Sequence, residues 1–185
     1  MNKKKICFIL LNWLFMASAF AQTPNILSKG KADSQECKDW VESRLEKMTL
    51  KEKIGQLFIH TVPLHDTEVN RKNIRNAVKE YKVGGFLFDN GQLGNQVNLT
   101  NYAQEMAEIP LLITFDGEWG LNMRLKEIPA FPRNRVLGCI QDNNLLYEYG
   151  KEVARQFREI GVHVNFAPVA DVDNNPLNPV INTRS

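Results

Sequence analysis

Acidic and amide side chains occur in three close pairs along the sequence. The pairs are Asp89 with Asn90, Asp116 with Glu118, and Asp171 with Asp173. One carboxylate can accept hydrogen bonds from two neighbouring hydroxyl groups, and charge-assisted bonds are about twice as strong as neutral ones. If the fold gathers these side chains in one place, they suit a ligand with many hydroxyl groups, such as a sugar. Taken singly, most residues of this kind only form turns or helix caps.

Each pair follows an apolar segment with the character of a buried β-strand. The predicted strands are residues 57–61, 83–88, 110–115 and 162–167. The spacing of apolar residues between and before them predicts helices at about 34–48, 49–55, 67–81, 96–107 and 143–160. Strands that are buried on both faces and separated by helices are typical of a parallel α/β sheet. Ligands of such sheets bind beyond the carboxyl ends of the strands, which is where all three pairs are expected to lie.

The helical spacing also predicts which side chains face inward. The first helix is expected to use Trp40, Val41, Leu45 and Met48. The helix at 67–81 is expected to bury Val69, Ile74, Val78 and Tyr81. The helix at 143–160 is expected to bury Leu145, Leu146, Tyr149, Val153, Phe157 and Ile160, and Gly161 is expected to end it. Residues 49–52 have the pattern of a capping box, in which Thr49 and Glu52 bond to each other's backbone amides.

The chain has room for about four strand–helix units, whereas a closed barrel of eight units needs roughly 250 residues. The pattern alone leaves a small open sheet and half of a barrel as alternatives. The sequence ends in the polar segment 182–185, with no helix to cover the last strand. A half-built sheet leaves apolar faces and an unpaired edge. We therefore predict the N-terminal half of a TIM-type (β/α)8 barrel, with parallel strands alternating with helices, that is interrupted before its second half.

The N-terminus has the order of regions found in a secretory signal peptide. Three lysines, Lys3 to Lys5, precede the apolar run 6–17, and small residues flank Phe20. The run is about 12 residues long, too short for a bilayer span of about 20, although an uncleaved anchor is the alternative. We predict a signal peptide at 1–21, cleaved after Ala21, a leader at 22–37, a partial barrel domain at 38–185, and a periplasmic or secreted location without a stable membrane span.

Removal of the signal peptide also changes the charge. Without its three lysines, the 23 basic residues become 20 against 21 acidic residues, a net charge of −1. This balance argues against a nucleic-acid partner. No cluster of residues has the spacing of metal ligands and no cofactor motif is present, so we expect neither a bound metal ion nor a cofactor. Cys37 and Cys139 can form a disulfide in an oxidising compartment or remain buried thiols.

Several motifs together resemble a known family. Residues 116–120, Asp-Gly-Glu-Trp-Gly, followed by Arg124, resemble the signature of glycoside hydrolase family 3, in which Asp, any residue, Glu and two glycines precede an Arg. Further segments resemble that family in the same order: 49–58 its opening helix, 84–86 its second strand, 131–132 its Phe-Pro loop, and 167–185 the segment after its fourth strand. The resemblance extends over residues 40–185.

The resemblance implies roles for three residues. Asp116 matches the aspartate that holds hydroxyls of the terminal sugar, and Arg124 and Arg184 match arginines of the same subsite. The alternatives are a surface ion pair for Arg124 and a frayed end for Arg184, and Glu118 is expected to be a structural partner in the loop. Trp119 stands where the family has its first glycine, so it is strained if that position requires φ > 0. Its ring can stack on a sugar or fill the core.

The ending of the chain, Asn-Pro-Val-Ile with Arg-Ser, resembles the β-N-acetylhexosaminidase branch. The resemblance then implies a retaining hydrolase that removes terminal β-linked N-acetylglucosamine from chitin-like or peptidoglycan-derived oligosaccharides. It places the nucleophile and the acid/base on later segments, and none of His60, His65 and His163 follows a lysine as the family's catalytic histidine does. We expect no catalytic residue in this chain. The alternatives are a non-catalytic carbohydrate-binding domain and a β-glucosidase-type member.

Overall fold

The computed structural model describes residues 34–175 and 177–185. The expected signal peptide and most of the expected leader lie outside these residues. Two compact units meet at the boundary between Lys38 and Asp39, and the second unit, 39–185, contains the sheet and the candidate site. Helix α2 (Gln35–Lys47) runs across this boundary.

The sheet of the second unit has four parallel strands in the order β1-β2-β3-β4. They are β1 (Ile59–Leu64), β2 (Gly85–Gly91), β3 (Leu112–Phe115) and β4 (Val164–Asn165). The parallel α/β class and all four strands are thus confirmed, although β1 begins two residues later than expected and β4 is only two residues long. Because all four strands are parallel, their carboxyl ends lie on the same edge of the sheet.

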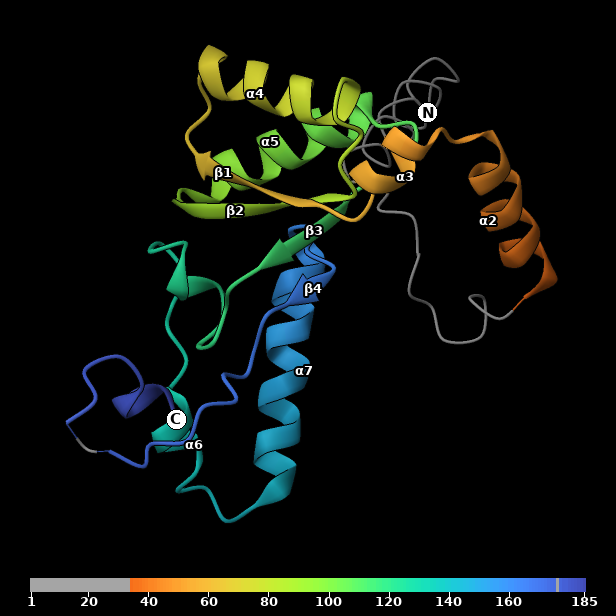
Figure 1. Cartoon of the computed structure of the whole chain (residues 1–185). Helices are drawn as coiled ribbons and strands as arrows, with labels where there is room; N and C mark the ends of the chain where they lie inside the picture. Colours follow the sequence, from red (N-terminus) through yellow and green to blue (C-terminus); the bar gives the residue numbers. More distant parts are fainter. Residues whose placement is uncertain (1–33, 176) are drawn as a thin grey trace, which may run out of the picture. The chain divides into compact units, whose positions relative to one another are not determined.

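Helices α4 (Glu68–Lys79) and α5 (Leu93–Met106) lie along β1 and β2, and α7 (Asn143–Glu159) lies beside β3 and β4 (Figure 1). The core between them is formed by fully buried side chains, the largest being Phe86, Phe88, Phe115, Leu64, Ile74 and Leu99. Phe157 of α7 packs on Phe115 of β3, with ring centroids 5.3 Å apart. Burial of this apolar surface, rather than the weak propensity of each helix, stabilises the arrangement.

Local signals in the sequence are confirmed. Thr49 caps α3 (Leu50–Gly55), and its side chain accepts from the amide of Glu52 while Glu52 accepts from the amide of Thr49. Gly161 has φ 75° directly after α7, as expected of a residue that ends a helix. The connection between β3 and α7, for which no helix was predicted, contains two short turns of helix, η1 (Leu121–Met123) and α6 (Asn134–Leu137).

Several predicted inward residues are exposed, and these predictions are wrong. Val69 and Tyr81 are 69% and 64% exposed, because α4 turns Asn70 inward in place of Val69. The Asn70 amide donates to the carbonyl oxygens of Pro63 and His65, at 3.1 and 2.8 Å, and so holds the β1–α4 loop. A polar side chain with two such bonds can occupy a buried position without an unpaired donor.

Other apolar residues are exposed at the margins of the sheet and on two helices. Leu145 is 58% exposed, and Trp40, Val41 and Leu45 of α2 are 40–46% exposed. The expected burial of strands on both faces is wrong for β1, where only Val62 and Leu64 are buried. Val62 and Leu64 are two residues apart and share one face of the strand, whereas Thr61 and Pro63 on the opposite face are exposed.

His163 joins β4 to β3 through both its backbone and its ring. Its amide donates to the carbonyl of Ile113 at 2.8 Å, and its Nδ1 accepts from the amide of Ile113 at 3.0 Å. Nε2 is buried and meets no partner among the described residues, so the ring is satisfied at one nitrogen only. Burial lowers the pKa of His163, because it disfavours the charged imidazolium.

This geometry predicts a pH-dependent stability. In the unfolded chain the histidine has an ordinary pKa of about 6.5, so it binds its proton at a higher pH than the histidine of the folded chain does. The contribution of His163 to stability is therefore fully present above about pH 6.5 and is lost as the pH falls through the folded pKa. His163→Asn keeps an acceptor for the Ile113 amide but cannot titrate. Thermal unfolding between pH 7 and pH 5 should therefore show a smaller loss of Tm in His163→Asn than in the unchanged protein. Parallel curves for the two proteins would show that His163 is not the titrating group.

Candidate functional site

At the carboxyl ends of β2 and β3, one arginine joins two aspartates. Arg124 Nη2 lies 2.6 Å from Asp116 Oδ2, and its Nη1 lies 3.5 Å from Asp89 Oδ1. The three side chains are 23% (Arg124), 30% (Asp116) and 54% (Asp89) exposed, so the cluster is held in place yet open to a ligand. The predicted pair Asp116 and Arg124 is thus in direct contact.

The backbone after β3 delivers Arg124 to this position. The turn η1 precedes it, and the carbonyl of Arg124 accepts from the amide of Gly91 at the end of β2, at 3.2 Å. Leu125, the next residue, is fully buried and forms an isolated parallel bridge with Gly91. The long connection after β3 therefore returns to the end of β2, and this brings an arginine and two aspartates of different strands together.

The third predicted residue, Arg184, lies beside the same loop but contacts a different carboxylate. Its Nε and Nη2 donate to the two oxygens of Glu118, at 2.9 and 2.5 Å. Glu118 is only 8% exposed in its side chain, and the bond to it raises the pKa of Arg184, with further contributions from the charges of Asp171 and Asp116. The structure thus makes Glu118 a structural partner, of Arg184 rather than of its own loop.

The remaining predicted residues divide into two groups. Asn90 donates through its amide to Asp89 Oδ1 at 3.0 Å, and Asp171 is exposed near Arg184. Asp173 instead forms an ion pair with Arg135, just outside the loop that holds Asp116. Of the six residues first singled out, four therefore lie at one edge of the sheet: Asp89, Asn90, Asp116 and Glu118. Asp171 lies close enough for its charge to act on Arg184, whereas Asp173 holds the C-terminal segment.

Asn165 was not predicted, although it fixes the loop between Asp116 and Glu118. Its Oδ1 accepts from the amide of Gly117 at 2.9 Å, and its Nδ2 donates to the Gly117 carbonyl at 3.3 Å. On the other side, a Cβ added at Gly117 would lie 2.4 Å from the ring of Phe157. The register Phe115–Asn165 explains this contact, but no local sequence pattern reveals it.

The backbone at Trp119 corrects one expectation. Within the described residues, only Lys82 and Asn182 among non-glycine residues have positive φ, so Trp119 is not strained. Gly120 takes the unusual conformation instead, with φ 77°, and a Cβ there would lie 2.7 Å from the ring of Phe131. The loop thus requires only the second glycine of the family signature. The Trp119 ring is partly buried, and the guanidinium of Arg133 lies over it at 4.5 Å.

Comparison with known proteins accounts for this arrangement. Residues 49–185 match the glycosyl hydrolase family 3 N terminal domain. The chain belongs to this family.

Two curated relatives illustrate the match. A beta-N-acetylglucosaminidase/beta-glucosidase of Cellulomonas fimi is 27% identical over 146 residues, covering 79% of this chain and 25% of that protein. Beta-hexosaminidase A of Pseudoalteromonas piscicida is 32% identical over 125 residues, covering 60% of this chain and 21% of that protein. The chain therefore spans about a quarter of the length of these relatives.

A solved structure has the same fold. Beta-glucoside phosphorylase BglX bound to 2FGlc superposes with a TM-score of 0.70 at 22% identity, over 85% of this chain and 28% of that one. At this identity the likeness concerns the fold alone. It agrees with the parallel sheet and alternating helices described above.

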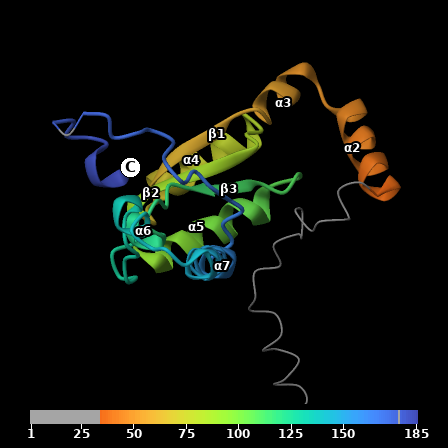
Figure 2. The same cartoon turned by 90° about the horizontal axis from the view of Figure 1, so that it is seen from below.

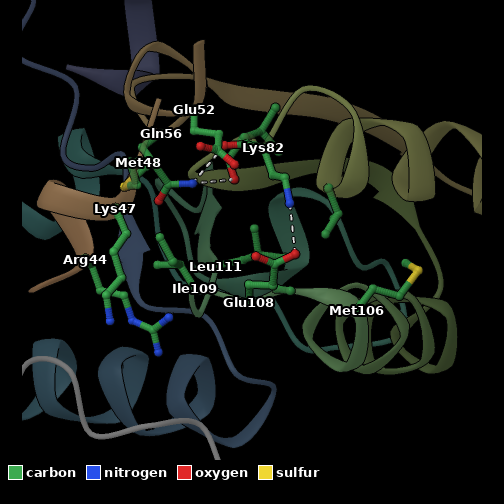
Figure 3. Close-up of a pocket in the computed structure, with 13 residues that line it drawn as sticks. Arg44, Lys47, Met48, Glu52, Gln56, Lys82, Met106, Glu108, Ile109 and Leu111 are labelled. Atoms are coloured by element: carbon green, nitrogen blue, oxygen red, sulfur yellow. Dashed lines mark hydrogen bonds and ion pairs between the residues drawn. The ribbon is translucent and has the colours of Figure 1, made fainter. Parts of the chain in front are cut away.

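The family 3 chain also has a hollow at the opposite end of its strands (Figure 3). This cavity of about 130 Å³ is lined near the start of β2 and β3 by Lys82, Glu108 and Gln56, among others. Lys82 Nζ lies 2.9 Å from Glu108, and the Gln56 amide donates to the Lys82 carbonyl at 2.8 Å. Because these groups satisfy one another and lie away from the carboxyl ends, we read this hollow as structural.

The described residues hold no group of three or more His, Cys, Asp or Glu side chains that could bind a metal ion. Cys37 and Cys139 are free thiols, and neither is fully buried, because Cys37 is partly buried and Cys139 is exposed. No helix in the described part of the chain is long and apolar enough to cross a membrane.

The contact at Gly117 gives a prediction for stability. Gly117→Ala places a methyl group against Phe157, which is 5% exposed and packed on Phe115 and cannot move away freely. Overpacking of this kind costs about 1–3 kcal/mol, measured as the free energy of unfolding in urea. Gly150→Ala is the matched control, because its Cβ meets nothing within 4 Å in the middle of α7, and alanine there should stabilise by about 0.5–1 kcal/mol. Equal effects of the two substitutions would contradict the packing argument.

Proposed function

We propose that this chain supplies the part of a family 3 glycosidase active site that holds the terminal sugar. The observation that carries the proposal is the contact of Arg124 with Asp116 and Asp89 at the carboxyl ends of β2 and β3. In parallel barrels this edge carries the active site. The proposed substrate-binding residues are Asp116, Arg124 and Arg184.

Each of these residues has a chemical reason to bind a sugar. Arg124 bonds to Oδ2 of Asp116, and the described residues provide no donor to Oδ1, which can then accept from sugar hydroxyls. The arginines stay charged at every physiological pH and offer rigid donors to ring and hydroxyl oxygens. Because three carboxylates, Asp89, Asp116 and Glu118, face two arginines, the cluster favours a neutral sugar over an anionic one.

The proposed reaction is removal of terminal β-linked N-acetylglucosamine from chitin-like or peptidoglycan-derived oligosaccharides. The names of the relatives, a beta-N-acetylglucosaminidase/beta-glucosidase and a beta-hexosaminidase, support it. The resemblance of the Asn178–Ser185 segment to that branch supports it further. The predicted signal peptide supports a periplasmic or secreted location, where such oligosaccharides occur.

Retaining hydrolysis needs a carboxylate nucleophile and a general acid/base about 5–5.5 Å apart. The carboxylates at this edge are engaged with arginines: Asp116 and Asp89 with Arg124, and Glu118 with Arg184. We infer that Asp116 and Asp89 face the sugar and that Glu118 positions Arg184, while the groups that break the glycosidic bond belong to other segments. On this reading the chain by itself binds but does not hydrolyse. The alternatives remain a non-catalytic carbohydrate-binding domain and a β-glucosidase-type enzyme.

An activity assay separates these alternatives. The full-length gene product is expected to release 4-nitrophenol faster from the N-acetyl-β-D-glucosaminide than from the β-D-glucoside, and residues 22–185 alone should release none from either. A preference for the glucoside would favour the β-glucosidase alternative. Binding of N-acetylglucosamine without release by the full-length protein would favour the carbohydrate-binding domain. Release by residues 22–185 would refute the proposed division of roles.

Asp116→Ala tests the binding role directly. It deletes the charged acceptor of Arg124 Nη2 and of the sugar hydroxyls. The kcat/KM of the full-length gene product should therefore fall by a factor that corresponds to a loss of about 2–4 kcal/mol of transition-state stabilisation. Glu148→Ala, which removes only the surface partner of Lys151, is the control and should leave kcat/KM unchanged. Unchanged kinetics in Asp116→Ala would remove this residue from the site.

A further inference from the structure

Two consecutive residues of the loop after β3 are linked to two consecutive residues of the C-terminal turn. Glu118 bonds to Arg184 directly, through both carboxylate oxygens. Its neighbour Trp119 reaches Thr183 indirectly, through Arg133. The turn η2 (Asn182–Arg184) is therefore attached to the loop at two adjacent points.

The indirect link has three parts that are each short. The Arg133 guanidinium lies 4.5 Å from the centre of the Trp119 ring, a distance at which a cation is attracted to the ring face. The same guanidinium donates from Nη1 to Thr183 Oγ1 at 2.8 Å. The backbones are also joined, because the amide of Phe131 donates to the Trp119 carbonyl at 3.3 Å. Trp119 thus contacts both ends of the segment 131–133, with its carbonyl at Phe131 and with its ring at Arg133.

The second attachment matters because η2 has little else to hold it. The turn has only three residues and none of them is buried. A further contact of the turn comes from α6, where Arg135 donates to Asn182, and the same arginine pairs with Asp173 outside the turn. Figure 1 and Figure 2 both show the C-terminal turn next to α6. A single ion pair to Glu118 fixes the position of the Arg184 head, whereas a bond to the adjacent Thr183 also limits rotation of the turn.

We propose that Trp119 and Arg133 are positioning residues that orient Arg184 in the sugar site through Thr183. In place of the first glycine of the family signature, Trp119 supplies an aromatic face that recruits Arg133. The inference rests on the proposed function, because it assumes that Arg184 contacts the terminal sugar. Neither Trp119 nor Arg133 needs to touch the sugar for this role.

Thr183→Val tests the link with the smallest change. Valine has the shape of threonine without the acceptor, and Thr183 is exposed, so the fold should be unaffected and Tm unchanged. For the full-length gene product acting on 4-nitrophenyl N-acetyl-β-D-glucosaminide, KM should rise about three- to tenfold, the effect of losing one charge-assisted bond. The value of kcat should change much less, because the chemical step uses other groups.

Three further variants and one control variant make the test more specific. Thr183→Ser restores the hydroxyl and should restore KM, whereas Arg133→Ala should raise KM as Thr183→Val does. The double variant Arg133→Ala with Thr183→Val should show no additional rise in KM, because both substitutions remove the same hydrogen bond between Arg133 and Thr183. Lys151→Ala on the surface of α7 is the control for loss of a positive charge and should not change KM.

The outcomes distinguish this inference from the proposed function. If Arg184→Ala impairs the enzyme while Thr183→Val and Arg133→Ala leave KM unchanged, or if their effects add, the positioning role is wrong and the proposed function stands. If the unchanged protein neither binds nor cleaves the sugar, the proposed function fails and this inference fails with it. A KM increase in Thr183→Val with unchanged Tm, reversed in Thr183→Ser, supports the role.

Discussion

The candidate site depends on one contact, the paired hydrogen bonds between the side chain of Asn165 and the backbone of Gly117. Gly117 separates Asp116 from Glu118, so its position decides where both carboxylates lie. Phe157 closes the other side of Gly117 so tightly that no Cβ fits there. A strand and a helix that follow much later in the chain thus fix a loop of two acidic residues. The two carboxylates then diverge, one to Arg124 and the other to Arg184.

The resulting balance of charge explains how an acidic edge can be stable and still remain open to a ligand. Asp116 and Asp89 share Arg124, and Glu118 has Arg184 to itself. The nearly buried Glu118 has two charge-assisted bonds, as a carboxylate removed from water requires. Asp116 and Asp89 keep more solvent contact, so they can exchange water for hydroxyl groups at small cost. Burial therefore separates the carboxylate that supports the site from those that can receive a ligand.

Much of the scaffold could be predicted from the sequence, because its signals are local. The capping box at Thr49, the stop at Gly161 and the four apolar strand segments each depend on a few neighbouring residues. The inward face of α4 could not be predicted from apolarity, since Asn70 replaces Val69 there by bonding to the β1–α4 loop. The exposure of Thr61 and Pro63 on one face of β1 depends on what packs against that face, which an apolar segment does not encode.

The candidate site was predicted in its residues but not in its connections. A resemblance to family motifs indicated Asp116, Arg124 and Arg184, and the structure brings the first two into contact. The partners Asn165 and Arg133 lie 48 residues beyond Gly117 and 50 residues before Thr183, and no spacing rule links such positions. Strain at Trp119 was predicted only if its position required positive φ, and this condition is not met, because of the two adjacent glycine positions of the motif only Gly120 has positive φ.

The order of the strands has a consequence for folding. Each strand pairs with the one next to it in sequence, so the sheet can grow from β1 to β4 by closing one connection at a time. The bonds of the candidate site differ in their separation along the chain, from 8 residues for Arg124 with Asp116 to 66 residues for Arg184 with Glu118. Closing a longer loop costs more chain entropy. The contact of Arg124 with Asp116 is therefore local, whereas the contact of Arg184 with Glu118 closes a loop that contains all of α7 and β4.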